Sequence, residues 1–312
     1  MFMPVPVIFP THIRLDLIVA AQTVVDDVCQ NQLGHMKRPP KIEVDFVASL
    51  IENGADAINN AWQPIFGRKI KVCVAGVFCH QSPKVTISDN PPYPVPTTSC
   101  ELADLLILHS HINSAGKEYW RAVLMQTKIV TGSGAIKPDE PQFWLYNRWP
   151  HFSISSPKFD RRARDFNADQ RSGRYGLLSN SGWLVLPPAK PLSAVSASTQ
   201  SLAEFLVAML YDMNPHQPGR TSQYGRQVYQ SSQYDWSPTV WDLLRLTAFR
   251  ALRHKGKQHG LYVGDMSRMG GRVLQLFTAQ SGSALPPDSP VAVKPDDDGG
   301  VNVLVIQTDQ SG

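Results

Sequence analysis

The stretches CELADLLILHSH (residues 100–111) and RAVLMQTKI (residues 121–129) decide the fold that this sequence predicts. Each contains a run of aliphatic residues typical of a buried strand. A short polar segment with one glycine separates them, so we expect the two strands to pair as an antiparallel hairpin. Polar side chains interrupt the apolar runs at Asp104, Gln126 and Lys128, which makes these residues the first candidates for chemistry.

The spacing of these polar residues predicts a common site. Side chains alternate along a strand, so Gln126 and Lys128 share one face while Met125 and Thr127 point away. Pairing of the hairpin then brings Asp104 beside them. Carboxylate and amide oxygens are hard ligands suited to Mg²⁺ or Mn²⁺, which lower the pKa of bound water. A nearby lysine can stabilise charge developing on a phosphate, so the pattern favours metal-dependent phosphodiester hydrolysis.

These residues resemble the PD-(D/E)XK nuclease superfamily. Its pattern is an acidic residue on one strand, a short hairpin, and then (D/E/Q)-x-K on the next strand. The matching pieces are Asp104 in ELADLLIL and Gln126-Thr127-Lys128 in LMQTKI, and the resemblance covers roughly residues 43–150. Ala103 stands where proline is usual, and the glutamine is similar to the Mrr-like branch. The resemblance implies an α/β fold with a restriction-endonuclease-like core and a Mg²⁺-dependent activity on nucleic acid.

The resemblance also implies one further acidic residue, often on the helix that precedes the strands. Residues 43–62 have the apolar spacing of an amphipathic helix. Glu52 lies in the middle of this helix beside its apolar stripe, and we take it as the helix acid. The predicted metal ligands are therefore Asp104, Gln126 and Glu52. Glu101, just before the first strand, is the alternative to Glu52 as the residue that completes the site.

The rest of the chain predicts alternating helices and strands. Helices are expected at 15–32, 43–62 (ended by Pro64), 140–149, 198–213 (capped by Ser198 or Thr199) and 237–256. Strands are expected at 68–80, 103–108, 121–130, 182–188 and 301–308, with a proline-rich loop over 82–97. We therefore expect a mixed central sheet flanked by helices, divided into an N-terminal lead (1–42), a nuclease-like core (43–190) and a C-terminal extension packing on the core (191–312).

Two basic segments could contact a nucleic acid backbone. Residues 158–174 carry six basic side chains against three aspartates, and residues 245–257 carry five basic side chains and no acid. Such segments bind phosphates without base preference, although a solvated helix end has the same composition. The residues that we expect to contact nucleic acid are Lys158, Arg161, Arg162 and Arg164.

The pair His109 and His111 offers a competing site. An HxH motif after a strand is one way in which metal hydrolases present two imidazoles to zinc or manganese. Such sites need further histidine or aspartate ligands, and no second motif is recognisable downstream. The alternative is that both histidines lie exposed in the turn of the hairpin.

Composition places the chain among globular proteins. Of its 312 residues 42% are hydrophobic and 18% are charged, and the net charge of +4 permits a nucleic acid partner without requiring one. The four cysteines form no CxxC pair, so we expect reduced thiols in a cytoplasmic protein. The N-terminal segment lacks the pattern of a signal peptide, and no run of 18 apolar residues predicts a membrane span.

The function favoured by the sequence is Mg²⁺-dependent cleavage of nucleic acid, with DNA as the expected substrate. By analogy with the superfamily, the protein would serve as a bacterial defence or restriction effector, acting with a partner protein. A second hypothesis is a catalytically weak nuclease-like module that binds nucleic acid or a partner subunit, because Gln126 replaces an acidic residue. A third is an HxH metallohydrolase acting on a small molecule.

Overall fold

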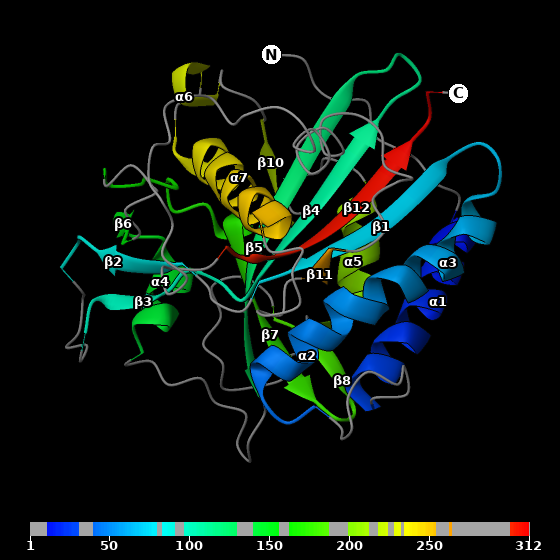
Figure 1. The fold of residues 1–312 in the computed structure, drawn as a ribbon, viewed down its shortest axis with the longest axis horizontal. Coiled ribbons are helices and arrows are strands. Elements are labelled where there is room, and N and C mark those ends of the chain that lie inside the picture. Colours follow the sequence, from blue (N-terminus) through cyan, green and yellow to red (C-terminus); the bar gives the residue numbers. More distant parts are fainter. Residues whose placement is uncertain are drawn as a thin grey trace.

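The structure is a computed structural model in which most of the chain is described. The described residues are 11–30, 40–79, 83–90, 97–129, 140–155, 162–186, 199–211, 218–223, 228–231, 234–253, 262–263 and 300–311. They form an α/β fold with a mixed, curled central sheet and helices on its faces, as the sequence predicted (Figure 1).

The central sheet has the strand order β11-β1-β12-β4-β5-β7-β8-β9, and β10 pairs with the first half of β5. Its strands are β1 (Lys71–Phe78), β4 (Leu105–Ile112), β5 (Glu118–Ile129), β7 (Gly173–Ser179), β8 (Gly182–Val185), β9 (Gln200–Ser201), β10 (Arg220–Ser222), β11 (Tyr262–Val263) and β12 (Asn302–Asp309). Two pairs are parallel, β12 with β4 and β5 with β7, and the other pairs are antiparallel. A smaller antiparallel sheet consists of β3 (Ser99–Glu101), β2 (Lys84–Ile87) and β6 (Phe152–Ile154).

Helices bury both faces of the central sheet. One face, which includes Leu105 and Met125, packs against the N-terminal helices and α5. The other face, which includes Leu106 and Leu124, packs against α4, α7 and the small sheet. The helical elements are α1 (Thr11–Gln30), α2 (Glu43–Ser49), the π-helical turn η1 (Leu50–Gly54), α3 (Ala55–Phe66), α4 (Pro141–Arg148), the 3₁₀ turn η2 (Gln170–Ser172), α5 (Leu202–Leu210), α6 (Val228–Ser231) and α7 (Trp236–Arg253).

The predicted hairpin is confirmed. Strands β4 and β5 pair antiparallel from Leu105 opposite Met125 to Ile112 opposite Glu118. The aliphatic residues of β4 are wholly buried, which explains why its sequence has no polar alternation in its first half. The first strand is longer than predicted, because the residues up to Ile112 continue in it rather than turning.

The expected division into lead, core and extension needs correction, because both ends of the chain build the core. Strand β12 lies in the centre of the sheet between β1 and β4, so the C-terminal segment is not an extension packed on a finished core. Helix α1 also contributes: Leu17 is fully buried, and its carbonyl accepts a hydrogen bond from the Trp62 indole at 2.9 Å. Figure 1 shows β12 running between strands from the first half of the chain.

The helix predicted over 43–62 is present, with two differences. A π-helical turn, η1, interrupts it, and Pro64 lies inside α3 instead of ending it; the helix ends at Gly67, whose φ of +64° favours glycine. The interruption lies where the helix packs closely on β1: a Cβ on Gly76 would come within 2.6 Å of the Ile51 carbonyl oxygen. Glycine at this position lets helix and sheet approach.

Of the remaining elements, some match the sequence predictions and others differ from them. The helices predicted over 140–149 and 237–256 are confirmed as α4 and α7. Ser201, rather than Ser198 or Thr199, caps α5, because it forms a reciprocal capping box with Glu204. Strand β2 lies within the segment expected to be a loop, and β7 lies in the arginine-rich stretch where no strand was predicted.

Candidate active site

Asp104 lies immediately before β4, where the β4–β5 hairpin opens. One of its carboxylate oxygens, Oδ2, accepts three hydrogen bonds from β5. The Gln126 amide donates at 2.5 Å, the Thr127 main-chain N–H at 2.6 Å and the Thr127 hydroxyl at 2.8 Å. No described group hydrogen-bonds to the second oxygen, Oδ1. The carboxylate is therefore held through one of its two oxygens.

The position of the carboxylate follows from where β4 begins. Strand β4 begins at Leu105, opposite Met125, so the end of β5 that follows Met125 has no β4 residue beside it. There the Asp104 carboxylate accepts the Thr127 N–H, which a strand carbonyl would otherwise accept. Because the carboxylate lies at the level of the sheet, side chains from both faces reach it. This corrects the expectation that Thr127 points away from the site: its hydroxyl contacts the same oxygen as Gln126 does.

The main chain of Asp104 is fixed as well as its side chain. Its N–H donates to the Met125 carbonyl at 3.0 Å, and its own carbonyl accepts from the Asn302 amide at 2.7 Å. Asn302 is buried at the start of β12, and its side-chain oxygen also accepts from the Cys79 N–H. This residue, almost 200 positions away in sequence, thus ties the candidate site to the last strand. Nothing in the local sequence indicates this role.

Burial sets the electrostatics of Asp104. Burial is the largest cause that raises the pKa of the carboxyl, and the charge of Glu101 also raises it, whereas the hydrogen bonds from Thr127 and the charge of Lys128 lower it. Together they move the pKa from 3.8 to about 6. The same surroundings raise the pKa of the Cys100 thiol to about 12, mainly through burial. Asp104 is therefore a carboxyl whose ionisation lies close to neutral pH.

Lys128 lies on the rim of this site. Its ammonium is 3.9 Å from the Glu140 carboxylate, just before α4, and both side chains are partly exposed to solvent. An ion pair of this length and exposure is weak, so the ammonium can move toward a ligand. Lys128 also lies near enough for its charge to lower the pKa of Asp104 and of Cys100.

The residues present fit a hard divalent cation. Oδ1 of Asp104 accepts no hydrogen bond from the described residues, and the Gln126 side-chain oxygen is buried without a hydrogen-bond partner among them. A buried carbonyl oxygen without a partner is unfavourable unless it meets a cation or water. Among the described residues no three His, Cys, Asp or Glu side chains lie together as a metal-binding group. A cation here would therefore depend on one carboxylate, one amide oxygen and water.

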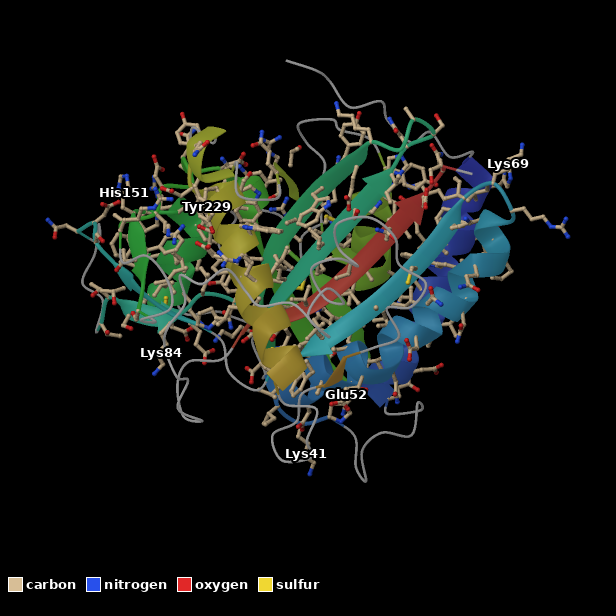
Figure 2. The ribbon with its side chains drawn as sticks, turned by 45° about the horizontal axis from the view of Figure 1, so that its top comes forward. Lys41, Glu52, Lys69, Lys84, His151 and Tyr229 are labelled. Atoms are coloured by element: carbon tan, nitrogen blue, oxygen red, sulfur yellow. The ribbon has the colours of Figure 1, made fainter. Side chains whose placement is uncertain are left out.

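The acidic residues predicted to complete the site occupy different places. Glu101 is exposed on β3, close enough for its charge to raise the pKa of Asp104. Glu52 is not among the groups that shift the pKa of Asp104; its helix covers the face that contains Leu105 and Met125, and it lies near the margin of the molecule in Figure 2. Sequence reasoning did not select Glu43, the first residue of α2, whose carboxylate accepts from the Ile129 N–H at 3.5 Å.

Two of the four predicted nucleic acid contacts, Arg162 and Arg164, form ion pairs within the fold. Arg164 is fully buried and pairs with Asp242 of α7 at 3.0 Å, which corrects the expectation that it contacts a phosphate. Arg162 is partly exposed and pairs with Asp235 at 2.9 Å. Lys158 and Arg161 lie outside the described residues, as do Lys255 and Lys257 of the second basic segment. Asp235, just before α7, and Asp242 within it thus neutralise charges that look uncompensated in the local sequence.

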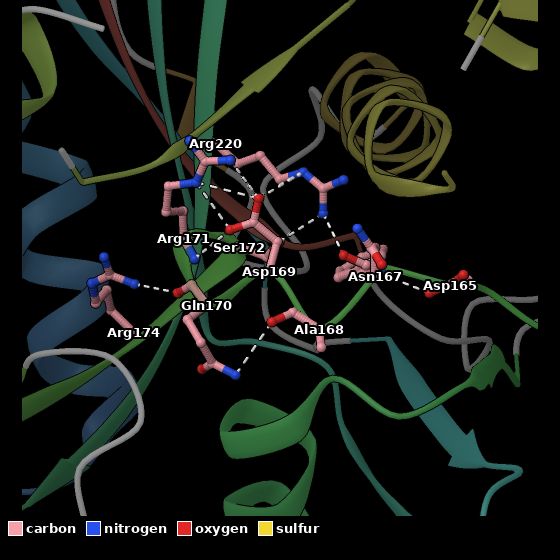
Figure 3. A network of polar contacts seen from close by, with 10 residues as sticks. Asp165, Asn167, Ala168, Asp169, Gln170, Arg171, Ser172, Arg174 and Arg220 are labelled. Carbon is pink, nitrogen blue, oxygen red and sulfur yellow. Dashed lines mark hydrogen bonds and ion pairs between the residues drawn. The ribbon is translucent and has the colours of Figure 1, made fainter. Parts of the chain in front are cut away.

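The remaining arginines of this stretch are bound in the network of Figure 3. Arg171 forms a two-pronged pair with Asp169, and Arg220 lies 3.5 Å from the same carboxylate. Arg174 is buried and donates to the Gln170 and Gly173 carbonyls. These contacts hold the turn before β7, so we assign these arginines a structural role.

The histidine pair lies in β4 and is buried, which corrects the expectation of exposed turn histidines. His109 Nε2 and His111 Nδ1 each lie 2.9 Å from the Thr308 hydroxyl of β12. Burial lowers the pKa of both imidazoles, and the Arg121 guanidinium lowers that of His109 further. His109 Nε2 and His111 Nδ1 therefore share the hydroxyl group of Thr308.

The fold and the candidate site are interpreted from the sequence and the structure of this protein alone. In the described part of the chain, no helix combines the length and the apolar character that a bilayer crossing requires. No family model, curated protein or solved structure matches this chain.

Proposed function

We propose that this protein is a metal-dependent nuclease that cleaves phosphodiester bonds of nucleic acid, with DNA as the first substrate to test. The observation that carries the proposal is the Asp104 carboxylate, whose Oδ2 is held by Gln126 and Thr127 and whose Oδ1 accepts no hydrogen bond from the described residues. Lys128 and Glu101 lie within electrostatic reach of it. A half-buried carboxyl with a shifted pKa beside a lysine is the kind of group that functional sites collect.

In this proposal Asp104 and Gln126 hold Mg²⁺ or Mn²⁺, and Glu101 adds negative charge to the site. Bound there, the cation would polarise the phosphate and lower the pKa of a coordinated water. Asp104 must be ionised to bind it. With a pKa of about 6 the carboxyl is largely ionised above neutral pH, and the cation itself favours the ionised form.

Lys128 has a different role in the proposal. Its ammonium is partly exposed, and within the described part of the chain its ion-pair partner is Glu140 at 3.9 Å, so it can approach a scissile phosphate. It would stabilise the negative charge that grows on the phosphate oxygens during attack by water. Three parts of the proposal rest on the resemblance in the hairpin motif. These are the nucleic acid substrate, the defence role and a partner protein that activates the nuclease.

The test compares wild type with Lys128→Ala and with Lys71→Ala, a matched control that removes an exposed lysine at the start of β1. Single- and double-stranded DNA and RNA are incubated with Mg²⁺ and with Mn²⁺, with and without any protein encoded beside this one. We expect cleavage by wild type and Lys71→Ala and none by Lys128→Ala. Equal cleavage by all three proteins would place the active site elsewhere.

One observation favours a second candidate, a nuclease-like module that binds nucleic acid or a partner without cutting. The Gln126 amide donates to Asp104 and thereby neutralises part of the charge that a cation needs. Gln126→Glu discriminates between the two. A gain of Mg²⁺-dependent cleavage in this variant, with nucleic acid binding but no cleavage by wild type, would favour the binding module.

A further inference from the structure

The last turn of α5 is bound to the sheet by side chains of β4 and β5. The Arg121 guanidinium donates to the Tyr211 carbonyl at 2.8 Å and to the Met209 carbonyl at 3.4 Å. His109 also donates to the Met209 carbonyl. The last carbonyls of a helix have no partner within the helix, and α5, all of which is described, has no basic residue in its own last turn. The sheet therefore supplies the groups that cap this end of the helix.

These bonds determine which nitrogen of His109 carries the proton. Its Nε2 lies 2.9 Å from the Thr308 hydroxyl, so the nitrogen that donates to the Met209 carbonyl is Nδ1. A neutral imidazole has one N–H, and its other nitrogen is an acceptor. Nε2 of His109 therefore accepts a hydrogen bond, and the Thr308 hydroxyl is its donor.

The chain of hydrogen bonds continues to His111. The Thr308 hydroxyl has one proton, which it gives to His109, so its oxygen accepts from Nδ1 of His111, 2.9 Å away. The main-chain carbonyl of Thr308 is a second acceptor for His111, which agrees with a donor on this side of the ring. The bonds thus run in one direction, from His111 through Thr308 and His109 to Met209. Both neutral imidazoles carry their proton on Nδ1.

We propose that this chain is a pH-sensitive switch, which holds the last turn of α5 against the sheet at neutral pH and releases it in acid. A second proton on His109 must go to Nε2, which then no longer accepts from Thr308. A buried imidazolium would also lie beside the Arg121 guanidinium. His111 differs, because a second proton goes to its Nε2 and leaves its bond to Thr308 intact. The switch does not depend on the proposed nuclease activity.

The charges at this end of the sheet make His109 the sensitive residue. Burial is the largest cause that lowers its pKa, and the charges of Arg121 and His111 lower it as well, whereas the bond to Met209 raises it. For His111, burial lowers the pKa, whereas the bond to the Thr308 carbonyl and the charge of Asp309 raise it. The other titratable or charged groups at this end are Tyr119, opposite His111 on β5, and Tyr211, whose ring lies 5.5 Å from the guanidinium of Arg14 on α1.

Helix α5 is the element that we expect to move. Strand β12 is paired along its main chain with β1 on one side and with β4 on the other, and Thr308 lies within both ladders. The polar contacts of the α5 end, in contrast, are those with the side chains of Arg121 and His109. Its last turn also buries Met209 and Leu210, so the released state is a minor one that hydrogen exchange can detect.

The first test determines the tautomers at pH 8 by nitrogen-15 NMR of protein labelled at histidine. We expect His109 and His111 to be protonated on Nδ1 and not on Nε2, and His109→Gln and His111→Gln identify their signals. A proton on Nε2 of His109 would overturn the direction of the chain and the switch with it. If a variant does not fold, the wild type alone decides, because at least two rings must show this tautomer.

The second test measures main-chain hydrogen exchange at pH 7 and pH 5, corrected for the intrinsic rate. An opening that lets His109 titrate at its ordinary pKa of 6.5 becomes about 20-fold more populated between these pH values. We expect this loss of protection at the Leu210 amide. His109→Gln should abolish it, whereas His151→Gln, which removes an exposed histidine beside β6, should retain it.

Low concentrations of urea distinguish a local opening from unfolding of the whole protein. Because urea favours states in proportion to the surface they expose, exchange at Leu210 should depend on urea weakly and exchange at Val305, in the centre of β12, strongly. An equal dependence at the two amides would mean that acid unfolds the whole fold, and the switch would be wrong. It would also be wrong if protection at Leu210 did not change with pH, or changed equally in His109→Gln.

Discussion

The two ends of the β4–β5 hairpin hold polar groups in opposite ways. At the open end, Asp104 receives three hydrogen bonds on one oxygen and none from the described residues on the other. At the far end, His109 and His111 share the hydroxyl of Thr308, and Arg121 donates to carbonyls at the end of α5. Both ends bury polar side chains on the same two strands. At the Asp104 end, one oxygen of an ionisable group is left without a hydrogen bond from the described residues.

This difference separates a candidate site from a structural network. A buried polar network that satisfies its members stabilises and specifies the fold. A charged group that is satisfied on one side only is costly, and such groups concentrate where a ligand completes them. We therefore expect changes at the Asp104 end to affect activity and changes at the histidine end to affect stability. The predictions below test that division, beginning with the largest effect.

The largest effect is expected for Lys128→Ala, at the Asp104 end. Loss of charge stabilisation that acts mainly in the transition state lowers rates by about 10²–10³. We expect cleavage to fall by that factor or more, while the urea midpoint stays near that of wild type, because Lys128 makes only a long, partly exposed ion pair. Single-turnover cleavage and urea denaturation measure the two quantities. A large loss of stability with unchanged cleavage would mean that the Asp104 end serves stability and not activity.

The second effect is expected at the histidine end, for Thr308→Val. This change removes the hydroxyl that both imidazoles share and leaves two buried ring nitrogens without it. Each buried polar group left unsatisfied costs about 1–3 kcal/mol, so we expect a loss of about 2–4 kcal/mol in the free energy of unfolding. Thr308→Ser, which keeps the hydroxyl, should stay near wild type. Equal losses in both variants would mean that packing, not the shared hydroxyl, matters here.

Much of the fold was predictable from the sequence. The β4–β5 hairpin, strand β1 and helices α4 and α7 follow from local apolar periodicity and breaker residues, which act over short distances. The place of β12 was not predictable in this way, because a central strand that pairs with β1 and β4 is chosen by long-range contacts. Strand β7 was not predicted, because its glycines and its arginine are not typical of a strand. Gly173 is needed there because a Cβ would collide with the side chains of Trp149 and Tyr146.

The candidate site was predictable only in part, for the same reason. Asp104 and Gln126 were placed together by hairpin register, and they do form a hydrogen bond. Thr127 and Asn302 were missed, because one breaks the strand alternation and the other comes from a distant strand. Arg164 looked like a phosphate contact because its partner Asp242 lies 78 positions away on α7.

A third, smaller effect is expected from acid. In the folded protein His109 stays neutral well below its ordinary pKa of 6.5, whereas the unfolded chain takes up the proton near that pH. Lowering the pH therefore favours the unfolded state, by about 2 kcal/mol between pH 7 and pH 5 for one such histidine. Urea denaturation across this range measures the loss. His109→Gln, which cannot be protonated, should show a shallower dependence, and an unchanged slope would contradict a neutral buried His109.

The smallest effect has the opposite sign and lies at the Asp104 end. Burial raises the pKa of this carboxyl from 3.8 in the unfolded chain to about 6, so the ionised group destabilises the fold fully above pH 6 and not at all below pH 3.8. Asn at this position can place its oxygen where Oδ2 accepts the same three donors, without the charge. We therefore expect Asp104→Asn to lose divalent-cation binding and cleavage but to gain about 1–2 kcal/mol of stability at pH 8, less than the full pKa shift implies because the residue is only half-buried.

The gain in Asp104→Asn should vanish near pH 4, where the wild-type carboxyl is protonated in the fold. Glu101→Gln, which removes a neighbouring but exposed charge, is the matched control and should change stability little at either pH. Urea denaturation of the three proteins at pH 8 and pH 4 gives the comparison. A residue kept ionised at the expense of stability is expected where activity requires the charge. If Asp104→Asn is less stable than wild type at pH 8, the carboxylate belongs with the histidine end as part of the structural network.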